Sequence, residues 1–181
     1  MMIAPTIETP RLRLRAAEMR DFDGYAATWA DEAVVRHIGG NIRTRNESWM
    51  RFIGLPGMWS LMGYGYWVFA DRLSDRFIGT GGLFWLDRGL GALEGVPEAG
   101  WAFAANAWGK GYASEAMGAA LGWADDVLGT DEVRCIINPG HGASERVAAK
   151  LGFAQTGSEM LHDELINVYA RVRGASCAPI K

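Results

Sequence analysis

A glycine-containing stretch, WGKGYASEA at residues 108–116, most narrows what this chain can fold into. Gly109 and Gly111 lack a Cβ, so the backbone can approach a bound group closely. The residues that follow have helical spacing, and the first amides of a helix have no partner inside it. Because the helix dipole and Lys110 add positive charge, the stretch predicts a site for an anion such as a diphosphate. Glycines before a helix are also common in loops that bind nothing, and the spacing alone leaves both interpretations open.

Two familiar phosphate-binding motifs are absent from this stretch. It contains no G-x-x-x-x-G-K-S/T loop, and no G-x-G-x-x-G followed about 20 residues later by an acidic residue that would hold a ribose. Neither a mononucleotide kinase nor a dinucleotide enzyme is indicated.

The order of the expected elements indicates a mixed α/β layer fold in a single domain, residues 1–181, with the last dozen residues as a tail. Asp21 is expected to cap the first helix, and Thr44 with Glu47 forms a capping box at the start of the second. Apolar periodicity predicts strands at 11–15, 64–70, 76–86, 98–104, 132–138 and 166–172, and helices at 20–38, from 44, from about 113 to 128, and at 143–152.

Composition sets limits on partners and compartment. A formal net charge of −3 argues against general affinity for nucleic acid, although it fits cationic amines. No apolar run approaches the roughly 20 residues of a membrane helix. Two cysteines, Cys135 and Cys177, do not form a disulfide framework, which favours a reducing cytoplasm. Cys135 lies in an expected apolar strand, where a small core residue is the usual role.

The stretch resembles the pyrophosphate signature Q/R-x-x-G-x-G/A of the GNAT superfamily of acyl-CoA N-acyltransferases. Trp108 stands in its first position, Gly111 in the glycine position and Ala113 in the last. The likeness is greatest to the ribosomal-protein N-terminal acetyltransferase branch. The stretches similar to that branch follow one another in the same order: ETPRLRLR at 8–15, FIGTGGL at 77–83, EAGWAFAANAWGKGYASEA at 98–116 and NPGHGASERVAAKLGF at 138–153.

This resemblance implies a splayed, mainly antiparallel sheet with helices on both faces, in which acetyl-CoA lies between the fourth and fifth strands. It implies no metal, and direct attack of an amine on the bound thioester. Backbone amides of residues 109–114 would hold the pyrophosphate, and an amide around Trp101 to Phe103 would face the thioester carbonyl. The implied cofactor contacts are Trp101, Ala102, Phe103, Trp108, Gly109, Lys110, Gly111, Tyr112, Ala113, Ser114, Asn138, His141, Ser144, Arg146 and Lys150.

Direct attack requires that an ammonium with a pKa of about 10.4 lose a proton, so a nearby base is useful. Glu98, at the start of the strand leading into the glycine loop, is the candidate base; the alternative is a surface glutamate at a strand end. His141 stands where the branch commonly has asparagine and could hydrogen-bond to the cofactor or replace Glu98 as base; an exposed loop histidine is the alternative.

A second departure concerns the proton donor to the leaving thiolate. Many superfamily members place a tyrosine where this chain has Ala148, so that acid is missing here. Ser144 could protonate the thiolate or bond to the pantetheine arm, or it could simply satisfy a helix amide.

The acceptor is the least constrained part of the prediction. Trp59, Tyr64 and Trp67 lie where related enzymes form the acceptor pocket, with core packing as the alternative. The predicted activity is acetyl transfer from acetyl-CoA to a primary amine of a protein N-terminus, a lysine or a small molecule. The alternative is a CoA-binding sensor or interaction module without turnover. The oligomeric state stays open, a homodimer included.

Overall fold

The computed structural model describes residues 2–175; Met1 and residues 176–181, with Cys177, lie outside that range. Within it, eight strands form one sheet in the order β1-β2-β3-β4-β5-β6-β8-β7. The strands are β1 (Ile7–Glu8), β2 (Leu12–Arg15), β3 (Tyr66–Asp71), β4 (Phe77–Phe84), β5 (Glu98–Phe103), β6 (Glu132–Ile137), β7 (Ala154–Leu161) and β8 (Glu164–Val172).

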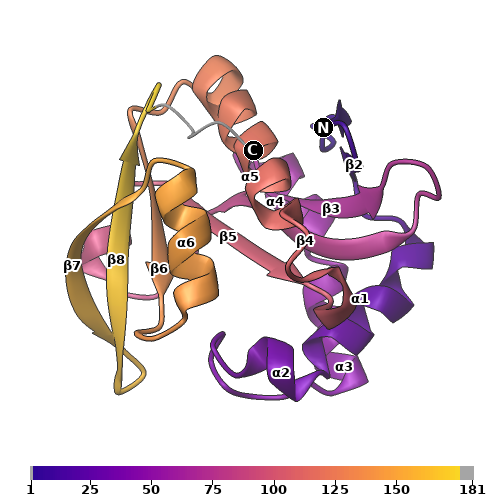
Figure 1. Cartoon of the computed structure of the whole chain (residues 1–181), viewed down its shortest axis with the longest axis horizontal. Helices are drawn as coiled ribbons and strands as arrows, with labels where there is room; N and C mark the ends of the chain where they lie inside the picture. Colours follow the sequence, from indigo (N-terminus) through magenta and orange to yellow (C-terminus); the bar gives the residue numbers. More distant parts are fainter. Residues whose placement is uncertain (1, 176–181) are drawn as a thin grey trace.

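The sheet is split at its centre. Every neighbouring pair of strands is antiparallel except β5 and β6, which are parallel and meet at the single register pair of Glu98 with Arg134. Beyond that pair the two strands diverge, and α6 lies beside the separated ends (Figure 1). The expected splayed, mainly antiparallel sheet is confirmed.

Helices cover both faces of the sheet, as the resemblance implied. Met117 and Leu121 of α5 pack on one face, whereas Phe22 of α1 and Phe52 of α3 pack with Ala102 on the other. Figure 1 shows α1, α2 and α3 grouped on one side of β5 and α5 on the other. The helices are α1 (Phe22–Trp29), α2 (Glu32–Val35), α3 (Arg45–Phe52), α4 (Leu55–Met62), α5 (Tyr112–Trp123) and α6 (Gly142–Lys150), with a π-helical turn at Ala124–Leu128.

The local predictions for the helices and the C-terminal tail hold in part. The helix expected at 20–38 is two helices, because Asp31 accepts a hydrogen bond from the amide of Ala33 and starts α2 afresh. The capping box of Thr44 and Glu47 is present at α3. Of the dozen residues expected to form a tail, the first three belong to β8, which runs to Val172.

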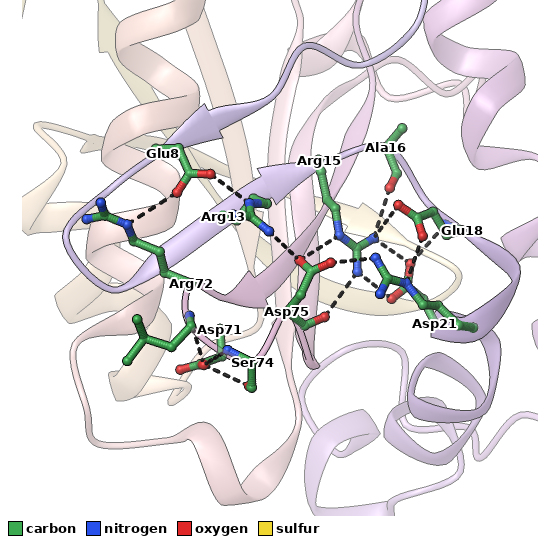
Figure 2. Close-up of polar contacts among 12 residues, drawn as sticks. Glu8, Arg13, Arg15, Ala16, Glu18, Asp21, Asp71, Arg72, Ser74 and Asp75 are labelled. Atoms are coloured by element: carbon green, nitrogen blue, oxygen red, sulfur yellow. Dashed lines mark hydrogen bonds and ion pairs between the residues drawn. The ribbon is translucent and has the colours of Figure 1, made fainter.

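Asp21 does not cap α1 with its side chain; it is the buried partner of Arg15 (Figure 2). Arg15 donates to the two Asp21 carboxylate oxygens at 2.7 and 2.9 Å, and to Asp75 of the β3–β4 hairpin at 3.1 Å. The hydrogen bond to Asp21 raises the pKa of Arg15 although burial opposes it. This cluster ties β2, the start of α1 and the hairpin together.

Candidate active site

The loop between β5 and α5 has the geometry of an anion site. The indole Nε1 of Trp108 donates to the carbonyl of Phe103 at 2.9 Å, which folds the loop back on the end of β5. Gly109 and Gly111 have φ angles of +73° and +78°, which favour glycine. Gly111 directly precedes α5, and no described side chain caps that helix. The first amides of α5 are therefore available to an anion.

A contact that the sequence did not indicate holds this loop in place. Glu115, in the first turn of α5, accepts hydrogen bonds from Thr9 at 2.7 Å and from the Arg11 amide and Nε at 2.9 and 2.6 Å. Arg11 also donates to the carbonyl of Lys110 at 2.7 Å and lies over the ring of Tyr112. Burial raises the pKa of Glu115, but the Thr9 and Arg11 hydrogen bonds outweigh it and leave the pKa lowered. The loop is thus braced by the start of β2.

The strand β5 leads from the closed end of the split sheet to the loop. Its edge toward β4 is fully paired, from Glu98 to Phe103. Its other edge has a described strand partner at Glu98 alone. The backbone around Trp101 and Ala102 therefore faces the gap between β5 and β6 without a ladder, which is the arrangement that an oxyanion-binding amide requires.

Glu98 is 4% exposed and forms an ion pair with Arg88, from the segment between β4 and β5. The Nε of Arg88 is buried and has no hydrogen-bond partner among the described residues. Burial lowers the pKa of Arg88. Glu98 is therefore not the surface glutamate of the alternative interpretation, and its carboxylate shares its site with a cation.

Tyr66 of β3 stands next to this pair, and no sequence signal had singled it out. A Cβ at Gly100 would collide with the Tyr66 hydroxyl, so that hydroxyl lies directly over β5. The ring packs edge-on against Phe84 at 5.0 Å between centroids. Burial raises the pKa of Tyr66, and the neighbouring Tyr25 adds to the shift.

The second predicted CoA-side motif begins at β6 and leads into α6. His141 precedes α6, and its ring stacks on that of His37, beyond the end of α2, with centroids 4.4 Å apart. Ser144 Oγ lies 3.5 Å from Nε2 of His141. Burial and the charge of His37 lower the pKa of His141. Asn138 donates to Glu164 of β8 at 3.3 Å.

The other predicted cofactor contacts lie on the surface or in the loop. Arg146 and Lys150 are exposed on α6, and Ser114 is buried in the first turn of α5. Lys110 Nζ donates to the carbonyl of Asn106 at 2.9 Å. The structure thus brings the glycine loop, β5 and the start of α6 around the gap between β5 and β6.

Two of the predicted acceptor contacts are wrong. Trp59 and Trp67 are 2% and 0% exposed, and they pack edge-on at 4.5 Å between ring centroids. Their indole N–H groups donate to the carbonyls of Tyr66 and Pro5. Both are core residues, because a side chain so covered has no surface left for an acceptor. Tyr64 is half-buried beside the same core.

The family model described as "Acetyltransferase (GNAT) domain" matches residues 11–154. The chain belongs to the GNAT acetyltransferase family. Acetyl-CoA is accordingly its acyl donor, and the chain is an acetyl-CoA-dependent acyltransferase. The uncapped N-terminus of α5 behind Gly111 fits the diphosphate of that donor.

Similar proteins agree with the family. "Uncharacterized N-acetyltransferase p20" of Bacillus licheniformis is 28% identical over 174 residues, covering 91% of this chain and 93% of that protein. A solved structure titled as a putative GnaT-family acetyltransferase from Bordetella pertussis is 29% identical, with a TM-score of 0.81 over 93% of this GNAT chain and 100% of its own.

More distant GNAT structures share the fold alone. RimL, titled a ribosomal L7/L12 alpha-N-protein acetyltransferase in complex with CoA, is 16% identical, with a TM-score of 0.75 over 95% of this chain and 100% of its own. The spermidine N-acetyltransferase from Vibrio cholerae, in complex with CoA and spermine, is 14% identical, with a TM-score of 0.73 over 92% of this chain and 98% of its own. The ribosomal-protein branch is thus one of several similar groups. No helix within residues 2–175 is long and apolar enough to cross a membrane.

Proposed function

We propose that this GNAT protein is an N-acetyltransferase that transfers acetyl directly to a primary amine in a ternary complex. The observation that carries the proposal is the separation of β5 from β6 beyond Glu98, next to the uncapped N-terminus of α5. This arrangement offers an anion site, a free strand edge and a buried carboxylate around one gap.

The chain's residues have distinct roles toward the donor. When bound, acetyl-CoA supplies an acetyl group activated as a thioester. The amides of residues 109–114 bind its diphosphate, and Arg146 and Lys150 are within the motif that faces its outer phosphates. A backbone N–H between Trp101 and Phe103 donates to the carbonyl oxygen of the acetyl group.

Proton transfer is assigned to two groups. Glu98 accepts a proton from the acceptor ammonium, directly or through water, and the ion pair with Arg88 orients its carboxylate. Ser144 donates a proton toward the leaving sulfur, with His141 beside it. His141 is the alternative base, because its lowered pKa keeps it neutral at pH 7.

Glu98→Gln tests the assignment. We expect kcat to fall by about 10²–10⁴-fold, the usual contribution of a general base, with acetyl-CoA affinity unchanged. The exposed Glu94→Gln is the matched control and should retain full activity. Release of CoA thiol would be followed with an amine panel, and acetyl-CoA binding by calorimetry with ATP and NAD as competitors. Undiminished kcat in Glu98→Gln would move the role of base to His141.

A catalytically silent CoA-binding module is the second candidate function. It is favoured by Ala148 in place of an acid tyrosine and by the ion pair that engages Glu98. Tight acetyl-CoA binding without transfer to any amine in the panel would establish it.

A further inference from the structure

Two half-buried cations, Arg43 and Arg88, lie on the side of β5 that α1 and Tyr66 cover, which we call its acceptor side. Arg43, from the segment before α3, lies over the ring of Trp29, which packs in the same core cluster as Tyr66 and Ala102 of β5. Arg88 lies over the ring of Phe84, against which Tyr66 packs. Arg43 also forms a hydrogen bond with Tyr25, which opposes the rise that burial gives to the pKa of Tyr25. Arg43 and Arg88 thus flank Tyr66, whose hydroxyl lies directly over β5. The chain as a whole has a formal net charge of −3, whereas this site contains more cations than carboxylates.

Arg43 has no ion-pair partner among the described residues. Its guanidinium carbon lies 3.6 Å from the centroid of the Trp29 ring, and the side chain is half-buried. Burial and the charge of Arg51 lower the pKa of Arg43. Glu47 is the one described carboxylate that acts in the opposite direction, and it is already engaged in the capping box of α3. A planar, partly desolvated guanidinium without a carboxylate is a ready binding group for one.

Arg88 is also incompletely satisfied. Its side chain is 21% exposed and its single described ion-pair partner is Glu98, while its Nε is buried without a hydrogen bond. The Nε itself is covered, so the exposed part of the guanidinium is what can donate to a ligand oxygen. Among the described residues, Glu98 is the one ion-pair partner of Arg88, and Arg43 has none, so these two cations share a single carboxylate.

We propose, resting on the proposed function, that the acceptor is a small amine that also carries a carboxylate, such as an amino acid, and that Arg43 with Arg88 recognises that carboxylate. Glu98 then faces the amine, and Tyr66 separates the two ends of the acceptor. A polyamine does not fit this side of β5, because its additional ammonium groups would meet guanidinium groups rather than carboxylates.

The test compares common α-amino acids with their carboxamides, which keep the amine and lose the negative charge. Spermine and a short peptide with a free N-terminus and an acidic second residue complete the panel. We expect kcat/KM for the preferred acid to exceed that for its carboxamide by roughly ten- to hundredfold, as one charge-assisted hydrogen bond allows.

Arg43→Met keeps an unbranched apolar side chain against Trp29 and removes the guanidinium with its cation–π contact. It should raise KM for the acid by roughly the same factor while leaving the carboxamide and acetyl-CoA affinity unchanged. Arg43→Lys should recover part of the loss. The matched control is Arg45→Met, whose side chain is 65% exposed and paired with Asp23 at the surface. Equal kcat/KM for acid and carboxamide, preference for spermine, or preference for the acidic peptide over every free amino acid would overturn the proposal.

A second readout separates this proposal from the proposed function. Calorimetric binding of the acid and the carboxamide to the CoA-loaded protein requires no turnover. Arg43-dependent binding of the acid alone supports the recognition even if no amine is acetylated, in which case only the proposed activity fails. Equal affinity for the acid and the carboxamide refutes the proposed carboxylate recognition, whether or not the protein acetylates an amine.

Discussion

Gly111 is the residue on which donor binding depends most directly. Its φ of +78° lies in the left-handed region, and it is the last residue before the first amides of α5. A Cβ there would also lie 3.4 Å from the guanidinium of Arg11. Any side chain at this position therefore strains the loop and narrows the approach to the amides.

We predict that Gly111→Val weakens CoA binding at least tenfold and costs about 1–2 kcal/mol of stability through backbone strain. Gly95→Val is the matched control, because Gly95 has a φ of +71° and a Cβ there would meet no atom within 4 Å. It should show the same strain and unchanged CoA affinity. Calorimetry and urea unfolding measure the two effects, and equal CoA affinity in both variants would contradict the role of the loop.

At the scale of elements, the buried pair of Arg15 with Asp21 fixes β2 to the start of α1 (Figure 2). Their side chains are 6% and 2% exposed, and removal of Asp21 leaves the buried Arg15 with Asp75 as its nearest remaining carboxylate. This clamp positions α1 and, through α1, Trp29 beneath Arg43. The acceptor side of β5, which α1 covers, is thus held in part by an ionic contact at the start of α1.

We expect Asp21→Ala to lower the free energy of unfolding by about 1–3 kcal/mol, because Arg15 loses its two-pronged partner and keeps Asp75. Asp23→Ala should cost under about 0.5 kcal/mol, because the carboxylate of Asp23 is 84% exposed in its pair with Arg45. Urea unfolding curves of the two variants provide the comparison. Similar midpoints would mean that the Arg15 cluster is not what stabilises α1.

At the scale of the whole molecule, the stacked rings of His37 and His141 join the two halves of the split sheet. His37 lies beyond α2 on one side, and His141 precedes α6 on the other. Burial lowers the pKa of His141, the charge of His37 lowers it further, and Glu145 opposes both. The contact is therefore made by a neutral His141.

This contact makes stability depend on pH in a defined direction. Unfolded histidine binds its proton near pH 6.5, whereas folded His141 binds it only at lower pH. The free energy of unfolding should therefore fall as pH drops below about 6.5 and level off below the folded pKa of His141. His141→Asn should flatten that fall, and the exposed His162→Asn should not. Urea unfolding between pH 5 and 8 measures the free energy of unfolding at each pH. If it falls equally in wild type and His141→Asn, the prediction is refuted.

Local sequence signals determined much of this protein. The capping box at Thr44, the periodicity of α5 and the glycines at 109 and 111 depend on residues a few positions apart, and they predicted elements that the fold contains and left-handed glycines before α5. Matches spread along the chain led to the GNAT family. The same signals placed Trp59 and Trp67 at the acceptor, where burial excludes them.

Only the tertiary structure decided which distant side chains meet. Arg43, Tyr66 and Arg88 come from three separate segments and have no common spacing, so their grouping around Trp29, Phe84 and β5 had no local signature. The overall negative charge pointed toward cationic acceptors, whereas the folded chain gathers guanidinium groups beside Glu98. Helix and strand signals act over a few residues, but burial and electrostatics depend on what the whole fold brings within a few ångströms.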